Sequence, residues 1–152
     1  MPQIGDPAPY FEGLTQGGAH VSLDDYKGKR LALYFYPRDH TPGCTKQACN
    51  LRDNYTLLAK NGIAILGVSD DPVEKHETFA GKFDLPFPLL ADTEKTTLNA
   101  YGTFGEKKLY GRTYMGTLRK TFLIDENGLI IHIIKKPKVG VHAEEILEAF
   151  ED

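Results

Sequence analysis

The chain has 152 residues, 41% hydrophobic and 26% charged, with a formal net charge of −3. This length suits one domain with its own core, and the weak negative charge argues against nucleic acid or an anionic membrane as a partner. The chain opens without a signal-like segment and contains no window of transmembrane length, so we expect a single cytoplasmic domain over residues 1–152.

The first half of the chain begins with a strand pattern followed by a helix pattern. Leu31–Tyr36 is a continuous apolar run that ends at Pro37, which predicts a buried strand. Apolar residues then recur at helical spacing and predict one long helix that closes at Asn61-Gly62. The predicted buried stripe of this helix comprises Cys44, Ala48, Leu51, Tyr55, Leu58 and Ala59.

A second strand and two further helices are predicted next. Ile63–Val68 reads as a buried strand. Asp71-Pro72-Val73-Glu74 offers a capping aspartate, a proline at the first helical position and a glutamate at the third, which predicts a helix start. Asp92 is expected to cap a helix that reaches Tyr101 and stops at Gly102.

The last part of the chain predicts a hairpin and a terminal helix. Lys120–Ile124 and Leu129–Ile134 flank a turn-forming Asp125–Gly128 segment, and Glu144–Phe150 has a helical pattern. Lys108–Gly116 is expected to be a loop that shapes any pocket. Early β-helix-β units followed by a hairpin and a helix describe a mixed α/β layer fold with parallel and antiparallel pairing.

Both cysteines of the chain, Cys44 and Cys49, lie five positions apart at the start of the first predicted helix. Unpaired N–H groups and the positive end of the helix dipole favour a thiolate at such a position. In a reducing cytoplasm a cysteine pair points to catalysis, redox sensing or metal binding rather than to a structural staple. These observations predict a thiol-redox protein.

The residues around Cys44 resemble a known signature. Pro37-x-x-x-Thr41-x-x-Cys44 is similar to the active-site motif of peroxiredoxins, and Cys49 resembles the branch called bacterioferritin comigratory protein or peroxiredoxin Q. In that family the matching proline, threonine and cysteine belong to the active site. The resemblance implies that Cys44 is the peroxidatic cysteine and that Cys49 resolves its oxidised form.

Three further segments extend the resemblance over nearly the whole chain. Arg119–Asp125 is similar to the family's arginine-bearing strand, while Leu85–Asp92 and Gly5–Pro9 match its flanking pattern. The resemblance implies a thioredoxin-like fold, with a central mixed sheet flanked by helices and an N-terminal extension.

The residue types fit the reduction of a peroxide by a thiolate. Such a reaction needs hydrogen-bond donors where charge develops in the transition state. Thr41 can hydrogen-bond the sulfur or the peroxide, and the backbone N–H groups of Gly43 and Cys44 point the same way. Arg119 presents several donors and a permanent charge, so it can stabilise the thiolate and the polarised O–O bond together. Pro37 stiffens the loop and shields the thiolate from water.

The five-residue spacing of the cysteines sets a geometric condition. In an intact α-helix such residues lie about 140° apart around the axis and about 8.6 Å apart between Cα atoms. A disulfide tolerates at most about 7 Å. If Cys49 resolves the sulfenic acid of Cys44, the helix must therefore unwind between Thr41 and about Arg52. The resulting strained disulfide would be open to a thioredoxin-type reductant.

The family resemblance also implies the partners. Hydrogen peroxide and organic hydroperoxides are the expected substrates, and thioredoxin or a similar thiol is the expected reductant. Neither a metal nor an organic cofactor is implied. This branch is often monomeric, so a monomer is expected.

Several alternatives remain open at this point. Cys49 can instead be a passive surface thiol, in which case a one-cysteine peroxidase would use an external thiol. A non-enzymatic redox sensor would use the same reactive cysteine without turnover. The spacing argues against a Cys-x-x-Cys disulfide reductase and a Cys-x-x-x-Cys copper protein, and two cysteines are too few for a zinc or iron–sulfur module.

The remaining candidate side chains are expected to play no direct part in the chemistry. His40 is expected to be a bystander although it lies close to Cys44. The other histidines, His20, His76, His132 and His142, are expected at the surface. Asp70-Asp71 is interpreted as a helix cap rather than as a catalytic carboxylate pair.

Overall fold

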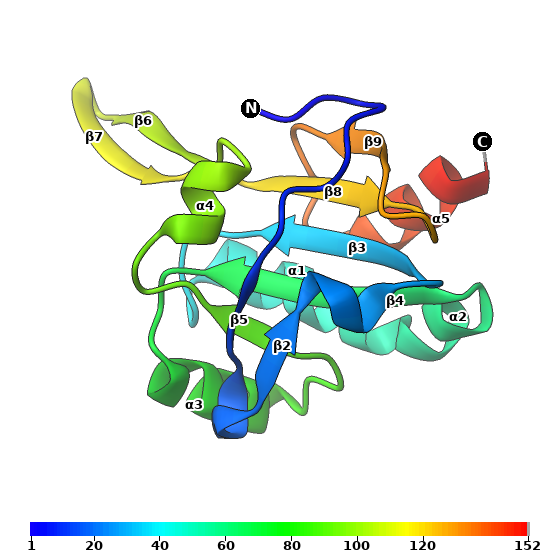
Figure 1. The fold of residues 1–152 in the computed structure, drawn as a ribbon. Coiled ribbons are helices and arrows are strands. Elements are labelled where there is room, and N and C mark those ends of the chain that lie inside the picture. Colours follow the sequence, from blue (N-terminus) through cyan, green and yellow to red (C-terminus); the bar gives the residue numbers. More distant parts are fainter. Residues whose placement is uncertain (152) are drawn as a thin grey trace.

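A five-stranded mixed sheet forms the centre of the computed structural model, which describes residues 1–151 (Figure 1). The strand order is β5-β4-β3-β8-β9. The strands are β3 (Arg30–Phe35), β4 (Ile63–Ser69), β5 (Leu89–Ala91), β8 (Lys120–Ile124) and β9 (Ile130–Ile134). β3, β4 and β5 pair in parallel, whereas β8 is antiparallel to both β3 and β9. The mixed sheet confirms the expected fold class.

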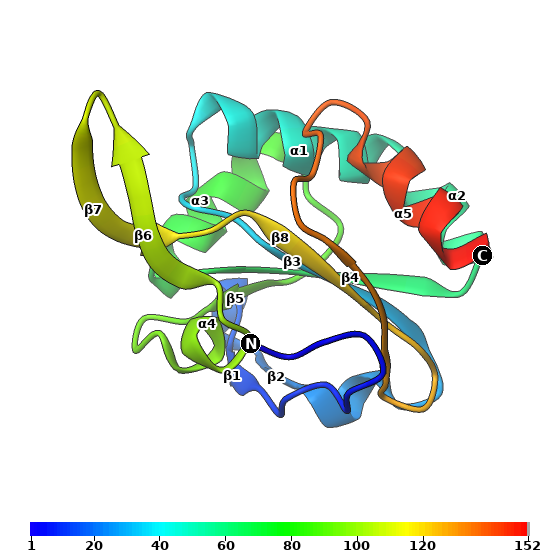
Figure 2. The same cartoon turned by 90° about the horizontal axis from the view of Figure 1, so that it is seen from above.

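Helices cover both faces of this sheet (Figure 2). One face carries α1 (Pro42–Asp53), α2 (Tyr55–Lys60), α3 (Val73–Phe83) and α5 (His142–Glu151). The other face carries α4 (Thr96–Ala100) and the N-terminal segment, which contains β1 (Glu12–Leu14), β2 (His20–Ser22) and the short 3-10 helices Gln16–Gly18 and Leu23–Tyr26. No helix among the described residues is both long and apolar enough to cross a membrane.

The central strand β3 explains why two separate apolar cores form. Side chains alternate between the two faces of a strand, so Ala32 and Tyr34 pack under α1 and α5 while Leu33 and Phe35 pack against the N-terminal segment and α4. All four side chains are buried. A strand covered on both faces needs apolar residues at every position, which is the pattern that the sequence shows.

The helix after β3 is shorter than its apolar pattern predicts. A single helix up to Asn61 was expected, but Asn54 adopts φ −108° and ψ 11° and separates α1 from α2. The Asn54 side-chain amide donates to the Asn50 carbonyl, so this carbonyl keeps a hydrogen-bond partner where the helix is interrupted. Ala59 is exposed, so its predicted place on the buried stripe is wrong.

The two predicted aspartate caps have different outcomes. The Asp92 carboxylate accepts the backbone N–H groups of Thr97 and Leu98, which confirms it as the cap of α4. Asp71 does not cap α3, because its carboxylate accepts the Ser69 hydroxyl and the Asp39 N–H instead. The interpretation of Asp70-Asp71 as a helix cap is therefore wrong.

The C-terminal part follows the sequence prediction closely. β8 and β9 pair across the Asp125–Gly128 turn, where Gly128 has a φ of +81° that favours glycine. α5 begins at His142 rather than at Glu144.

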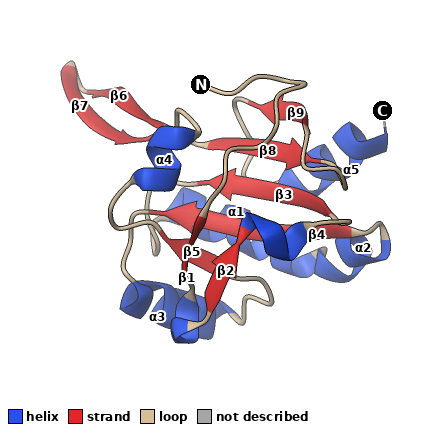
Figure 3. Cartoon of the chain, in the orientation of Figure 1, coloured by secondary structure: helices blue, strands red, loops and turns tan. Residues whose placement is uncertain are grey.

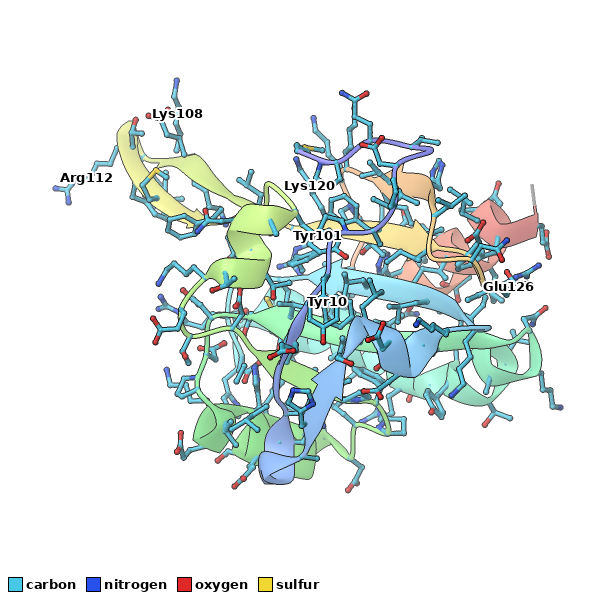
Figure 4. All side chains as sticks on the ribbon, viewed as in Figure 1. Tyr10, Tyr101, Lys108, Arg112, Lys120 and Glu126 are labelled. Carbon is cyan, nitrogen blue, oxygen red and sulfur yellow. The ribbon has the colours of Figure 1, made fainter. Side chains whose placement is uncertain are left out.

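The segment expected as a loop is instead part of a second hairpin. β6 (Phe104–Leu109) and β7 (Arg112–Thr117) pair in antiparallel fashion and project from the sheet (Figure 3). Tyr110 and Gly111 join them with positive φ angles of 50° and 77°, as in a type I′ turn. Most residues of this hairpin are exposed, so its sequence lacks the alternation of apolar and polar residues that would predict a strand. Lys108 and Arg112 point away from the body of the protein (Figure 4).

Candidate active site at the start of helix α1

Cys44 lies in the first turn of α1, directly after the short loop that connects β3 to this helix. Thr41 is the last residue before the helix, and Pro42 occupies its first position, where a missing N–H costs no hydrogen bond. Cys44 therefore lies in the first turn, where backbone N–H groups have no partner within the helix. The thiol is buried, at 2% exposure, and both cysteines are free within an intact α1.

The Arg119 side chain reaches the Cys44 sulfur from the other side of the site. Arg119 lies directly before β8, which is held by its pairing with β3. Its Nη2 lies 3.3 Å from the Cys44 Sγ, within the range of an N–H···S hydrogen bond. A permanently charged donor at this distance can stabilise negative charge that develops on or beside the sulfur. The structure thus brings together these two residues, as the sequence predicted.

Gln47 belongs to the same cluster and was missed in the sequence. Its Oε1 accepts a hydrogen bond from the Arg119 Nη1, and its side chain is fully buried. The contact orients the guanidinium so that a second N–H points at Cys44. A polar residue three positions after Cys44, on the stripe that carries Ala48 and Leu51, was the available signal.

Thr41 lies beside the sulfur-bearing turn, but its hydroxyl is engaged elsewhere. The hydroxyl donates to the Arg38 carbonyl at 2.9 Å, and among the described residues it makes no hydrogen bond to Cys44. Because its proton is used in this way, the Thr41 oxygen keeps lone pairs that can accept a proton donor such as a peroxide O–H. Of the two hydrogen-bond partners expected for Thr41, the sulfur and the peroxide, this geometry favours the peroxide.

A cavity of about 370 Å³ opens between the active-site loop and the projecting hairpin. Pro37 and Thr41 line one side, while Lys107, Tyr114 and Met115 line the other. The backbone of Gly43 lies close to the guanidinium, since a Cβ at this position would come 3.4 Å from the Arg119 Nη2. The cavity gives a small molecule a route to the loop that carries these residues.

Lys107 adds a second positive charge near the sulfur and was not recognised in the sequence. Its Nζ donates to the Thr117 carbonyl at 3.0 Å. Burial, together with the neighbouring charge of Arg119, lowers the pKa of Lys107, while Cys44 acts in the opposite direction. Its exposed neighbours gave no sign that this lysine would face the site.

Cys49 is partly exposed and lies further along the same intact helix. The helix beyond it is fixed by two neighbours. Asn50 donates to the Gly140 carbonyl and accepts from the Ala143 N–H, which ties α1 to the start of α5. The Arg52 guanidinium donates to the Phe83 carbonyl at the end of α3.

Two of the histidines expected at the surface are fully buried, so that prediction is wrong for both. The His76 Nδ1 lies 2.6 Å from an Asp39 carboxylate oxygen. His142 lies between the Thr121 hydroxyl and the Glu145 carboxylate, and burial lowers its pKa below the ordinary value. Both predictions failed because a pattern of apolar residues does not show which polar side chains form hydrogen bonds with one another inside a core.

Of the other three histidines, His20 and His132 are exposed, as expected. His40 is also exposed and packs its ring against Phe79 at 5.1 Å between centroids, with no hydrogen bond to Cys44. Within residues 1–151, no three His, Cys, Asp or Glu side chains form a group that could hold a metal ion.

Known proteins resemble this chain along almost its entire length. Residues 4–133 match the family model described as AhpC/TSA family. A putative peroxiredoxin bcp of Coxiella burnetii is 46% identical, over 95% of this chain and 96% of that protein. The structure of a cysteine mutant of PrxQ from Xylella fastidiosa superposes with a TM-score of 0.93 and 31% identity, over 99% of this chain and 96% of that one.

A third similar structure adds a chemical observation about a related protein. The bacterioferritin comigratory protein of Xanthomonas campestris is 34% identical, with a TM-score of 0.87 over 93% of this chain and 90% of that one. Its structures are described as insights into alkyl peroxide reduction from a trapped intermediate and ligand complex. These neighbours share the thioredoxin-like peroxiredoxin fold.

Proposed function

The chain belongs to the AhpC/TSA family, in its Bcp/PrxQ peroxiredoxin branch, and we propose that it reduces hydrogen peroxide and organic hydroperoxides at Cys44. The observation that carries this proposal is the contact of the Arg119 guanidinium with the Cys44 sulfur, oriented by Gln47. The cavity lined by Pro37 and Thr41 supports access of a small hydroperoxide to the loop that precedes Cys44.

The proposed reaction begins with attack of the Cys44 thiolate on one peroxide oxygen. A new S–O bond forms, the O–O bond breaks, and the second oxygen leaves with the electron pair and takes up a proton to give water or an alcohol. Sulfur is thereby oxidised to a sulfenic acid. Arg119 and the N–H groups of Gly43 and Cys44 stabilise the charge that moves from sulfur to oxygen. The Thr41 oxygen accepts a hydrogen bond from the peroxide O–H and orients the peroxide, and Pro37 limits the access of water.

Resolution then requires Cys49 to reach the sulfenic acid. The Cys49 thiolate attacks the Cys44 sulfur, so the S–S bond forms while the S–O bond breaks, and the leaving hydroxide takes up the proton released by the Cys49 thiol to give water. Because an intact α1 holds the two Cα atoms about 8.6 Å apart, the first turns must unwind before this bond can form. Thioredoxin or a similar dithiol reduces the disulfide and returns the enzyme to its starting state. We further propose that one cytoplasmic, monomeric domain over residues 1–152 carries the whole cycle.

A one-cysteine cycle is the second candidate, because Cys49 lies within an intact helix and is partly exposed. In this alternative an external thiol attacks the sulfenic acid of Cys44, and α1 stays folded. A non-enzymatic redox sensor, the third possibility, would become oxidised once and would not turn over.

Peroxide-dependent NADPH oxidation, coupled through thioredoxin reductase with and without thioredoxin, tests the proposal. We expect continuous turnover that depends on thioredoxin and disappears in Cys44→Ser. Peroxidase activity that survives in Cys44→Ser would contradict the proposal that Cys44 reacts with the peroxide. Stoichiometric oxidation without turnover would favour the sensor, and turnover with a monothiol alone would favour the one-cysteine cycle.

A further inference from the structure

A buried polar cluster lies beneath the active-site loop and takes no part in the peroxide chemistry described above. The Asp39 carboxylate accepts the Tyr36 hydroxyl at 2.6 Å and lies 2.6 Å from the His76 Nδ1. The Asp39 N–H donates to an Asp71 carboxylate oxygen at 2.7 Å. His76 is fully buried and Asp39 is 4% exposed. A polar cluster removed from water in this way is costly unless every member is paired.

The hydrogen bonds of His76 fix the number of protons that the pair holds. The His76 Nε2 lies 3.1 Å from the Leu90 carbonyl oxygen, which can only accept, so Nε2 carries a proton. The Nδ1 faces a carboxylate oxygen at 2.6 Å, and two lone pairs do not approach so closely without a proton between them. Asp39 and His76 therefore share one proton in addition to the one on Nε2.

The pair connects the active-site loop to α3 rather than to α1. Asp39 lies between Pro37 and Thr41, whereas His76 lies in the interior of α3. The next residue, His40, has a φ of +64°, a conformation that side chains rarely adopt and that marks a turn between the fixed loop and α1. The loop therefore has an anchor that does not depend on the helix carrying Cys44.

We propose that Asp39 and His76 are positioning residues, joined by one shared proton, that hold the Pro37–Thr41 loop in place while α1 unwinds and refolds. This inference rests on the proposed function, because it concerns the site to which Cys44 returns. While Asp39 and His76 stay paired, Thr41 keeps its position. The Cys44 sulfur then returns to an ordered loop when α1 refolds. Without it, both the loop and the helix have to be ordered again in every cycle.

Several polar groups from neighbouring segments face the pair. Tyr34 approaches from β3 and Tyr36 from the position directly after it. Asp71 comes from the segment before α3 and the Leu90 carbonyl from β5, while His40 is the exposed neighbour of Asp39. Burial raises the pKa of both tyrosines well above the ordinary value of 10.0, so both stay neutral. Asp71 is satisfied by the Ser69 hydroxyl and the Asp39 N–H.

Substitutions at Asp39 separate the positioning role from a general loss of structure. In Asp39→Asn the amide can accept from Tyr36 and donate to a neutral His76, so the cluster stays paired without the shared proton. Asp39→Ala removes these contacts. The rate constant for oxidation of Cys44 by hydrogen peroxide, measured in competition with a haem peroxidase, should fall by about tenfold to a hundredfold in Asp39→Ala, since small misplacements near the chemistry cost up to about 10²-fold. Asp39→Asn should stay within about threefold of wild type at pH 7.

A matched pair of tyrosine variants provides the control. Tyr36 and Tyr101 are both buried and each donates a hydrogen bond of 2.6 Å, to Asp39 and to the Pro9 carbonyl respectively. Tyr36→Phe should lower the rate constant about tenfold, the cost of one hydrogen bond to a charged group, whereas Tyr101→Phe should leave it within about twofold. Both variants remain informative if Asp39→Ala fails to fold.

The His76 ring gives a readout that a purely structural role would not move. In nitrogen-15 NMR spectra, the His76 Nδ1 should carry or share a proton in wild type and should be unprotonated in Asp39→Asn, where it accepts from the amide. Identical Nδ1 signals in the two proteins would overturn the shared-proton anchor. So would equal rate constants in wild type, Asp39→Ala and Tyr36→Phe. A wild-type protein that does not react with peroxide contradicts the proposed function instead, so the two failures are distinguishable.

Discussion

The Arg119 Nη2 lies 3.3 Å from the Cys44 Sγ although the two residues are 75 positions apart in the sequence. One of them is held at the edge of a strand and the other in the first turn of a helix. The sheet therefore positions the positive charge, and the helix positions the thiol.

Arg119→Ala should lower the rate constant for Cys44 oxidation by about 10²- to 10³-fold, the usual cost of one missing donor at a developing charge. Arg119→Lys should recover only part of the loss, because an ammonium group keeps the charge but cannot bridge Gln47 and Cys44 in the same fixed geometry. Competition kinetics with hydrogen peroxide measure both, with circular dichroism as the control for folding. Equal rates in Arg119→Ala and wild type would remove Arg119 from the site.

Gln47→Leu should lower the same rate constant about tenfold, since the guanidinium would lose the acceptor that orients it. The matched control is Lys46→Leu on the exposed side of the same helix, which should stay within about twofold. If both variants behave alike, the contact between Gln47 and Arg119 has no part in the reaction.

Cys49→Ser should leave a sulfenic acid on Cys44 that a dimedone-type reagent can trap, because its intramolecular partner is gone. Over-oxidation to the sulfinic acid should rise with peroxide dose and is measured by intact-protein mass spectrometry. Thioredoxin-dependent turnover retained at the wild-type rate in this variant would show that Cys49 is not required and would favour the one-cysteine cycle.

Hydrogen exchange should reveal the unwinding of α1 in the oxidised protein. Amides from Thr45 to Cys49 should lose protection when the disulfide forms, and the loss should fade toward Arg52, where contacts to α5 and α3 oppose it. The reduced protein and the oxidised Cys49→Ser variant, which cannot form the disulfide, serve as references. Protection that persists throughout α1 after oxidation would contradict the prediction that this helix unwinds.

The buried His142 should make the fold sensitive to acid. Burial lowers its pKa from 6.5, so the unfolded chain binds this proton more readily than the folded one. Stability contributed by the neutral imidazole is then present above about pH 6.5 and declines as the pH falls through the lower folded value. Thermal melting at pH values between about 5 and about 8 measures this loss, and His142→Gln should show a shallower decline. A variant with the same slope as wild type would assign the acid sensitivity to other groups.

Local patterns predicted most of the fold because each central element satisfies one simple rule. β3 is apolar at every position since both of its faces are covered, and Gly128 occupies a left-handed turn position between β8 and β9. The break at Asn54 escaped prediction because an asparagine inside a helical pattern signals only a weak preference. The second hairpin escaped because it lies largely in water and shows no apolar face.

The candidate site was only partly accessible from physical patterns. Cys44 is recognisable from its place at a helix start, but Arg119 was identified through resemblance to a family, since no spacing rule connects a helix with a distant strand. Gln47 pairs with Arg119, and Asp39 pairs with His76, in each case across elements that meet only after folding. Their positions depend on tertiary contacts, which a linear pattern does not contain.

The pairing of β8 with β3 leaves room for protein engineering in the second hairpin. Because the partners of β8 are fixed from Leu31 opposite Ile124 to Phe35 opposite Lys120, the position of Arg119 is set by the sheet and not by the length of the hairpin that precedes it. The hairpin tip at Tyr110, which is 96% exposed, should therefore accept an inserted peptide or a fluorescent label. A reporter attached there would lie on the hairpin that borders the cavity beside the active-site loop, without interrupting the strand register that positions the guanidinium.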